Sequence, residues 1–142
     1  MIRQFKKNDL PAVMQIWLDT NIKAHDFIPK EYWENNYEIV KEILPDAEIY
    51  VHDDDTAGFI DVFIGLTDNY IAGIFVKEDK QSKGIGKQLL NYVKNIKPNI
   101  SLNVYQKNTK AVRFYKHEQF KIVSENVDDI NNEKEFIMEW NK

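Results

Sequence analysis

Hydrophobic residues at helical spacing follow a short alternating stretch at the start of the chain. Residues 2–6 alternate between apolar and polar, which is typical of a β-strand. Apolar residues then recur at intervals of three and four over residues 10–18 and again over 33–44, where Pro45 ends the pattern. We therefore expect a strand and two amphipathic helices, with a polar and aromatic connection between the helices at residues 25–29.

The middle of the chain changes to the two-residue period of β-strands. Residues 47–52 alternate, and an acidic turn with Gly58 joins them to a second strand at 59–66, which together predict a hairpin. Residues 70–76 are almost wholly apolar, a pattern that suits a strand covered on both faces.

The second half of the chain predicts a crossover from strand to helix to strand. Helical spacing over residues 85–96 ends at Pro98, and residues 100–105 alternate as in a strand. Because such connections are right-handed crossovers between parallel strands, we expect this strand to run parallel to residues 70–76. The remaining pattern predicts a helix at 109–117 and strands at 120–123 and 135–140. Residues 1–142 are thus predicted to form one α/β domain, a mixed sheet with helices on both faces.

The composition narrows the possible functions. The 142 residues include no cysteine, so a disulfide framework, a cysteine zinc site and a thiolate nucleophile are excluded, and we expect no metal. A net charge of -4 with only two arginines disfavours nucleic acid, which requires a positive surface. No stretch approaches the roughly 18 apolar residues of a membrane span, and no secretory signal is recognisable, so we expect a cytoplasmic protein without a membrane partner.

A turn with two glycines lies between the apolar strand and the helix that follows it. In this segment, Gln81–Gly86, backbone N–H groups at the helix start can converge on a phosphate. The segment does not match the dinucleotide fingerprint, because Leu89 stands in place of the last glycine, or the P-loop, because Gln88 stands in place of serine or threonine. Taken alone, the glycines are explained more simply by a tight turn.

Together with residues downstream, this turn resembles the GNAT superfamily of N-acetyltransferases. Gln81, Gly84 and Gly86 match the family's acetyl-CoA motif, Gln/Arg-x-x-Gly-x-Gly/Ala, after a central strand. The next strand and helix of the family are matched by Asn103-Val104, by Asn108-x-x-Ala111-x-x-Phe114-Tyr115 and by Phe120. The resemblance covers residues 70–120 in order and spacing, whereas the flanks agree more loosely.

The resemblance implies a mostly antiparallel sheet with one parallel, splayed strand pair, and acetyl-CoA as cosubstrate without a metal. The pantetheine would bind the backbone edge of Ile74, Phe75 and Val76, where an N–H polarises the thioester carbonyl. Lys80 and Lys110 can add positive charge, although each taken singly is better explained by a solvated surface. The residues expected to hold the rest of CoA are Gln81, Ser82, Lys83, Gly84, Ile85, Gly86, Lys87 and Asn108.

The implied mechanism is direct attack of a neutral amine on the thioester, which expels CoA thiolate. Tyr115 occupies the family's position for the phenol that protonates this thiolate, although helical spacing alone would make it a core aromatic beside Phe114. Asp61 interrupts an otherwise apolar strand, so it lies either on a wet face or in a functional position. The base that takes the amine proton is left open among Asp61, Tyr70, His25 and an ordered water.

The residues that would bind the acceptor are indicated less clearly than those that would bind CoA. His25, Phe27 and Trp33, with Tyr32, are candidates for its wall, although a hydrophobic core is the simpler explanation for the aromatic residues. Asn103 faces the cleft by alternation and is a candidate to bind the acceptor. The predicted function is acetyl transfer to a primary amine of a small molecule, peptide or protein, by a monomer or homodimer. The alternative is a non-catalytic acyl-CoA sensor, while an RNA acceptor is disfavoured by the acidic charge.

One position departs from the family pattern. Gln119 stands where a glycine commonly precedes Phe120. The preceding helix therefore either ends without a left-handed residue or tolerates strain of about 1 kcal/mol.

Overall fold

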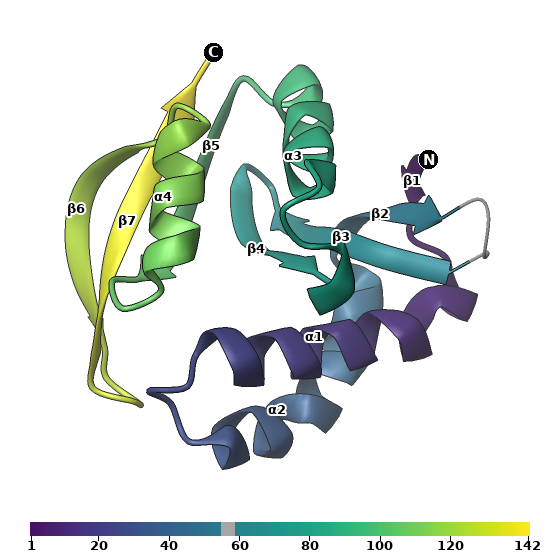
Figure 1. Cartoon of the computed structure of the whole chain (residues 1–142), viewed down its shortest axis with the longest axis horizontal. Coiled ribbons are helices and arrows are strands. Elements are labelled where there is room, and N and C mark those ends of the chain that lie inside the picture. The colour runs from purple at the N-terminus through teal and green to yellow at the C-terminus, as the bar shows by residue number, and fades with distance from the viewer. Residues whose placement is uncertain (55–58) are drawn as a thin grey trace.

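The computed structural model describes residues 1–54 and 59–142, which form one sheet with helices packed on it (Figure 1). The predicted hairpin turn with Gly58 lies outside these residues. The helices are α1 (Leu10–Ala24), α2 (Lys30–Ile43), α3 (Ile85–Ile96) and α4 (Thr109–His117), with short 3-10 turns η1 (Lys7–Asp9), η2 (Leu44–Asp46) and η3 (Glu78–Lys80). The strands are β1 (Ile2–Gln4), β2 (Glu48–Asp54), β3 (Phe59–Thr67), β4 (Tyr70–Val76), β5 (Asn99–Tyr105), β6 (Lys121–Asp128) and β7 (Glu133–Asn141).

The described strands form a seven-stranded sheet in the order β1-β2-β3-β4-β5-β7-β6. Every neighbouring pair is antiparallel except β4 and β5, which run parallel and are joined through α3. This arrangement confirms the predicted fold class, a mostly antiparallel sheet with one parallel strand pair. Within the described ranges, no helix has the length and apolar character needed to cross a bilayer.

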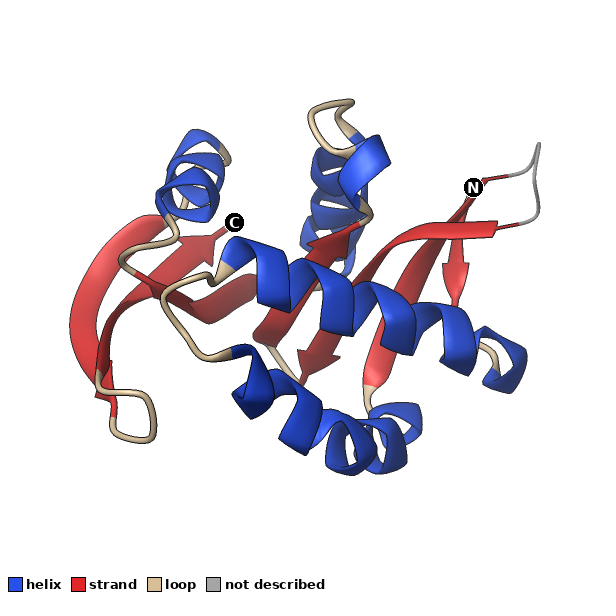
Figure 2. Ribbon diagram, turned by 60° about the horizontal axis from the view of Figure 1, so that its bottom comes forward, coloured by secondary structure: helices blue, strands red, loops and turns tan. Residues whose placement is uncertain are grey.

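Helices cover both faces of the sheet, as predicted. Figure 2 shows α1 and α2 on one side of the strands and α3 and α4 on the other. The buried side chains divide accordingly into two clusters. One cluster packs α1 and α2 on the sheet, with Trp17 and Trp33 in edge contact at 5.9 Å between ring centroids. The other joins α3 and α4 to the opposite face through Leu89, Leu90 and Tyr115.

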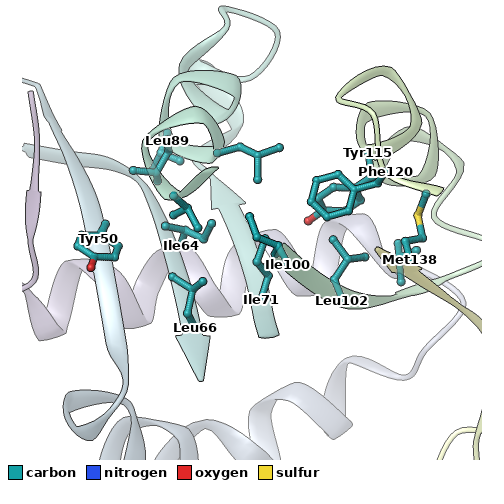
Figure 3. Close-up of a cluster of buried hydrophobic side chains, with 14 of the residues drawn as sticks. Tyr50, Ile64, Leu66, Ile71, Leu89, Ile100, Leu102, Tyr115, Phe120 and Met138 are labelled. Carbon is teal, nitrogen blue, oxygen red and sulfur yellow. The ribbon is translucent and has the colours of Figure 1, made fainter. Parts of the chain in front are cut away.

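Alternation along the strands assigns side chains to these two layers. Ile100, Leu102 and Val104 of β5 are buried under α3 and α4, as Figure 3 shows for the first two. The residues between them therefore point to the α1 and α2 side. The pattern that predicted the strand from sequence thus also determines which face each polar residue of β5 occupies.

Strand β4 differs from its prediction in one respect. It has the predicted bounds, but only Ile71 is fully buried, while Ile74, Phe75 and Val76 are partly exposed. The reason is that β4 pairs with β5 only at Tyr70 and Ile71 and then separates from it. Pairing with β3 skips Ala72, which forms a bulge where the strands part. The apolar half of β4 therefore borders open space instead of a second strand.

The end of α4 resolves the question raised by Gln119. Its backbone has a φ of 74°, the left-handed region, and the N–H of Phe120 donates to the Tyr115 carbonyl at 2.9 Å. The helix therefore keeps the left-handed residue that the family usually builds from glycine, and a glutamine side chain bears the strain.

We expect Gln119→Gly to raise the free energy of unfolding by up to about 1 kcal/mol, because glycine adopts this φ without a steric penalty. Urea unfolding followed by circular dichroism measures the change. As a control, Lys116→Gly places glycine at a helical position of α4 and should lower stability by about 1 kcal/mol. A loss of stability in Gln119→Gly would contradict the strain.

Candidate active site

A cavity of about 1450 Å³ lies between β4 and α4, beside the parting of β4 from β5. Its walls come from α1, the end of β4, η3, the start of α3 and α4. The cavity is lined by most of the predicted CoA-binding residues, namely Ile74, Phe75, Val76, Gln81, Ser82, Gly84, Ile85, Gly86, Lys87, Asn108 and Tyr115. Lys83 does not line it and is exposed.

The turn before α3 has the backbone conformation of an anion site. Ser82 and Gly84 have φ of 63° and 79°, and Gly84 is the N-cap of the helix. The first N–H of α3 bonded within the helix is that of Gln88, which donates to the Gly84 carbonyl at 3.1 Å. The N–H groups of Ile85 and Gly86 are thus left at the helix start, where the helix dipole also favours negative charge.

The charges around this turn are unusual for a helix start. The first turn of α3 has no acidic residue, and instead Lys87 lies there without an ion pair to any described residue. A lysine at this position is disfavoured by the dipole, so a bound anion would relieve a local cost. Three other lysines of the cavity wall have acidic partners: Lys80 pairs with Asp54 at 3.3 Å, Lys107 with Glu133 at 3.1 Å, and Lys23 with Glu78.

Gln81, the first residue of the motif, connects three elements. Its side-chain amide donates to the carbonyl of Val76 at 3.1 Å, and its Oε1 accepts from Lys110 Nζ at 3.0 Å. The side chain therefore ties the end of β4 to the turn and to α4, which holds the two walls of the cavity together. Both of these hydrogen bonds are made to the protein itself, one to a backbone carbonyl and one to a lysine side chain.

Tyr115 comes from α4 and is 7% exposed, with its ring against Phe114 and Phe120. Figure 3 shows its hydroxyl on the side of the ring that faces the strands. The hydroxyl has no hydrogen-bond partner among the described residues, although the side chain lines the cavity. Burial, and then the proximity of Tyr70, raise the pKa of Tyr115 well above its usual value. The phenol is therefore neutral and available to donate a proton.

His25 also lines the cavity, at the C-cap of α1. Asn108 is the N-cap of α4: its Oδ1 accepts from the Ala111 N–H at 3.2 Å, which leaves its Nδ2 facing His25 Nε2 at 3.2 Å. The imidazole stacks on Trp33 at 5.4 Å between centroids. Burial lowers the pKa of His25 to about 4, against smaller opposing effects of the Asn21 backbone and Asp26. His25 is thus a neutral ring that joins α1 to α4 across the cavity.

Asp61 is not brought to the cavity, so its candidacy as a base is not supported by its position. Pairing of β2 with β3 skips Asp61, which forms a bulge. Its side chain is 3% exposed and lies 2.8 Å from His52 Nδ1. An acidic residue interrupts the apolar strand because the bulge turns it toward this histidine, a partner that the strand pattern alone did not indicate.

The remaining predicted site residues lie on the other side of the sheet opening. Tyr70 is partly exposed at the start of β4, and Asn103 lies on the α1 and α2 face of β5. Trp33 is 8% exposed in the core under α1 and α2, and Phe27 packs on His25 and Tyr105. Trp33 and Phe27 therefore pack against the His25 ring and do not line the cavity.

Two carboxylates that were not predicted as site residues lie on the late strands, and the charge of one of them, Glu135, acts on Tyr70. Glu135 of β7 accepts from the amide of Asn126 at 3.0 Å, and Asp128 of β6 accepts from the Tyr105 hydroxyl at 2.6 Å. Strand β6 extends beyond its predicted range to include Asp128, whereas Glu135 lies within the range predicted for the last strand. Only the register of these strands brings the two carboxylates beside β5, so their positions along the chain do not indicate this proximity.

Comparison with known proteins identifies the family. Residues 45–122 match the model of the acetyltransferase (GNAT) domain. The chain is 34% identical to the peptidyl-lysine N-acetyltransferase YiaC of Escherichia coli (strain K12), over 99% of this chain and 96% of that protein. It is 31% identical to the peptidyl-lysine N-acetyltransferase YjaB of Salmonella typhimurium (strain LT2), over 91% and 89% respectively. The solution structure of apo YjaB from Escherichia coli is similar to this one with a TM-score of 0.87 and 25% identity, over 99% of this chain and 96% of that chain.

The chain belongs to the GNAT family of acetyltransferases. It is an acetyl-CoA-dependent N-acetyltransferase, which confirms the enzyme class predicted from the sequence. Neither the relatives nor the site geometry favours the alternative of a non-catalytic sensor.

We expect Gly84→Ala to weaken CoA binding about fivefold, because alanine strains the left-handed backbone of the anion site by about 1 kcal/mol. Isothermal titration calorimetry with CoA measures the dissociation constant. Gly65→Ala is the control, since a Cβ there would meet no atom within 4 Å and its φ is not left-handed. Equal affinity in Gly84→Ala and the wild type would contradict the assignment of the anion site.

The depressed pKa of His25 predicts that stability falls in acid. The folded pKa, about 4, is below the ordinary value of 6.5, so the unfolded chain binds the proton more readily. The contribution of His25 is complete above pH 6.5 and is lost as the pH falls toward 4. We expect the free energy of unfolding to fall more steeply between these pH values in the wild type than in His25→Asn, as measured by urea unfolding. Equal slopes would contradict the prediction.

Proposed function

We propose that this enzyme transfers the acetyl group of acetyl-CoA to the ε-amine of lysine in a peptide or protein. The main support is the position of Tyr115, a neutral phenol that lines the cavity beside the parted strands and has no protein hydrogen-bond partner among the described residues. The choice of acceptor is supported by the curated relatives YiaC and YjaB, both named as peptidyl-lysine N-acetyltransferases.

Acetyl-CoA would bind along two features of the cavity. Its diphosphate would accept hydrogen bonds from the N–H groups that begin α3, with Lys87 supplying charge. Its pantetheine amides would pair with the backbone of Ile74–Val76, which is paired with no strand on the β5 side among the described residues because β4 and β5 have parted. A thioester held this way would lie between β4 and α4, within reach of the Tyr115 side chain.

The reaction would be a direct transfer. The lysine nitrogen forms a bond to the acetyl carbon, the C–S bond breaks, and the CoA thiolate leaves as a thiol with a proton from Tyr115. A backbone N–H of β4 would stabilise the charge on the carbonyl oxygen. The amine would lose its proton to water, because Asp61 lies away from the cavity. Tyr70 is unsuited to this step because partial burial raises its pKa, so it stays protonated.

Tyr115→Phe should lower kcat for acetylation of a lysine-containing peptide by about 100-fold or more, since a general acid is lost while packing is kept. Its CoA affinity should change less than about threefold, because the diphosphate and pantetheine contacts remain. Mass spectrometry of the peptide measures transfer, and calorimetry measures binding.

Tyr92→Phe is the matched control, because Tyr92 lies on α3 against Tyr50 and does not line the cavity. It should keep wild-type kcat. Absence of peptide acetylation by the wild type, with CoA binding intact, would overturn lysine as the acceptor. Full activity in Tyr115→Phe would instead overturn the role of the phenol.

A further inference from the structure

Glu135 lies on the sheet face that is turned away from α4. In the pairing of β5 with β7 it is directly opposite Tyr105, so both side chains are on one face. The flanking β5 residues Leu102 and Val104 are buried on the other face, in the core under α3 and α4. Asn103 shares the face of Glu135, and its Nδ2 lies 3.5 Å from the carboxylate.

The carboxylate of Glu135 is half-buried and has only neutral partners. Besides Asn103, the amide of Asn126 donates to it at 3.0 Å, and no lysine or arginine among the described residues forms an ion pair with it. The neighbouring Glu133, by contrast, pairs with Lys107 at 3.1 Å. The two amides hold the Glu135 carboxylate in place while leaving its charge without a counterion.

This carboxylate lies beside the opening between β4 and β5. Tyr70 pairs with Ser101, one position before the last pair at which the strands meet, on the same face as Asn103. Partial burial raises the pKa of Tyr70, and the charge of Glu135 adds to the effect, whereas the Asn103 backbone opposes it. Glu135 and Tyr70 therefore lie on the face of the opening that is turned away from α4, whereas Tyr115 lines the CoA cavity under α4.

We propose that Glu135 binds the ammonium group of the acceptor lysine as it enters from the α2 side of the sheet. The inference rests on the proposed acetyl transfer to lysine and makes Glu135 a residue that determines specificity for cationic acceptors. A carboxylate that is already held by amides and lacks a counterion gains a charge-assisted hydrogen bond when an ammonium arrives, with little reorganisation. The partly buried hydroxyls of Tyr32 and Tyr105 and the carboxylate of Asp128 add polar groups around this approach.

Glu135→Gln tests this role, because it removes the charge and keeps the shape. With a lysine peptide at pH 7, we expect KM to rise about 10-fold and kcat to change less than about threefold. With methoxyamine, an acceptor that is uncharged at this pH, kcat/KM should stay within about twofold of wild type. The difference between the two acceptors separates loss of charge recognition from a general structural defect.

Glu139→Gln is the matched control, since Glu139 lies on the same strand and face but is exposed and carries the same charge. It should behave as wild type with both acceptors. Unchanged KM for the lysine peptide in Glu135→Gln, equal losses with both acceptors, or an equal effect of Glu139→Gln would each overturn the inference. If the wild type acetylates methoxyamine but no lysine peptide, the proposed function fails, and the role of Glu135 fails with it.

Discussion

The parting of β4 from β5 is the constraint on which the rest of the site depends. The two strands pair only at Tyr70 and Ile71, and the bulge at Ala72 turns β4 away. Beyond that point β4 stays paired with β3 but pairs with no strand on the β5 side among the described residues, so a ligand with amide groups can complete the sheet. The helices α3 and α4 pack over the two parted halves, which places the helix start and Tyr115 on either side of one opening.

The contacts that span this opening are few and polar. Gln81 Oε1 accepts a hydrogen bond from Lys110 Nζ, and Asn108 Nδ2 lies within hydrogen-bond distance of His25 Nε2. Both pairs join elements that the parted strands would otherwise leave apart. The bond between the neutral Asn108 and His25 side chains contributes about 1 kcal/mol, and the bond from the Lys110 ammonium contributes up to about 3 kcal/mol. Such contacts join the walls without closing the cavity, which suits a site that must admit a long cosubstrate.

The sequence predicted the elements well, and most of the residues expected on the CoA side line one cavity, whereas Asp61, Phe27 and Trp33 do not line it. The predicted bounds of β4, α3 and α4 agree with the structure because each apolar pattern extends over many residues. The ends of the two helices are also marked by Gly84, Pro98 and Asn108. The turn residues could be picked out because a motif depends on local spacing. The position of Asp61 away from the cavity could not be predicted, because the bulge that turns it to His52 depends on pairing between strands.

The position of Glu135 also depends on strand pairing, which the sequence pattern does not show. It stands in a strand of alternating polar and apolar residues, where a glutamate is the ordinary solvent-facing choice. Its importance arises only from the order of the strands, because β7 inserts between β5 and β6 and so brings the carboxylate beside Asn103. The two faces of the opening thus differ in charge: a helix start with Lys87 on the CoA side, and on the other side carboxylates that form no ion pair with any residue the structure describes. A sheet that parts in the middle can accept an anion from one face and a cation from the other, so that the two reactants meet where the strands separate.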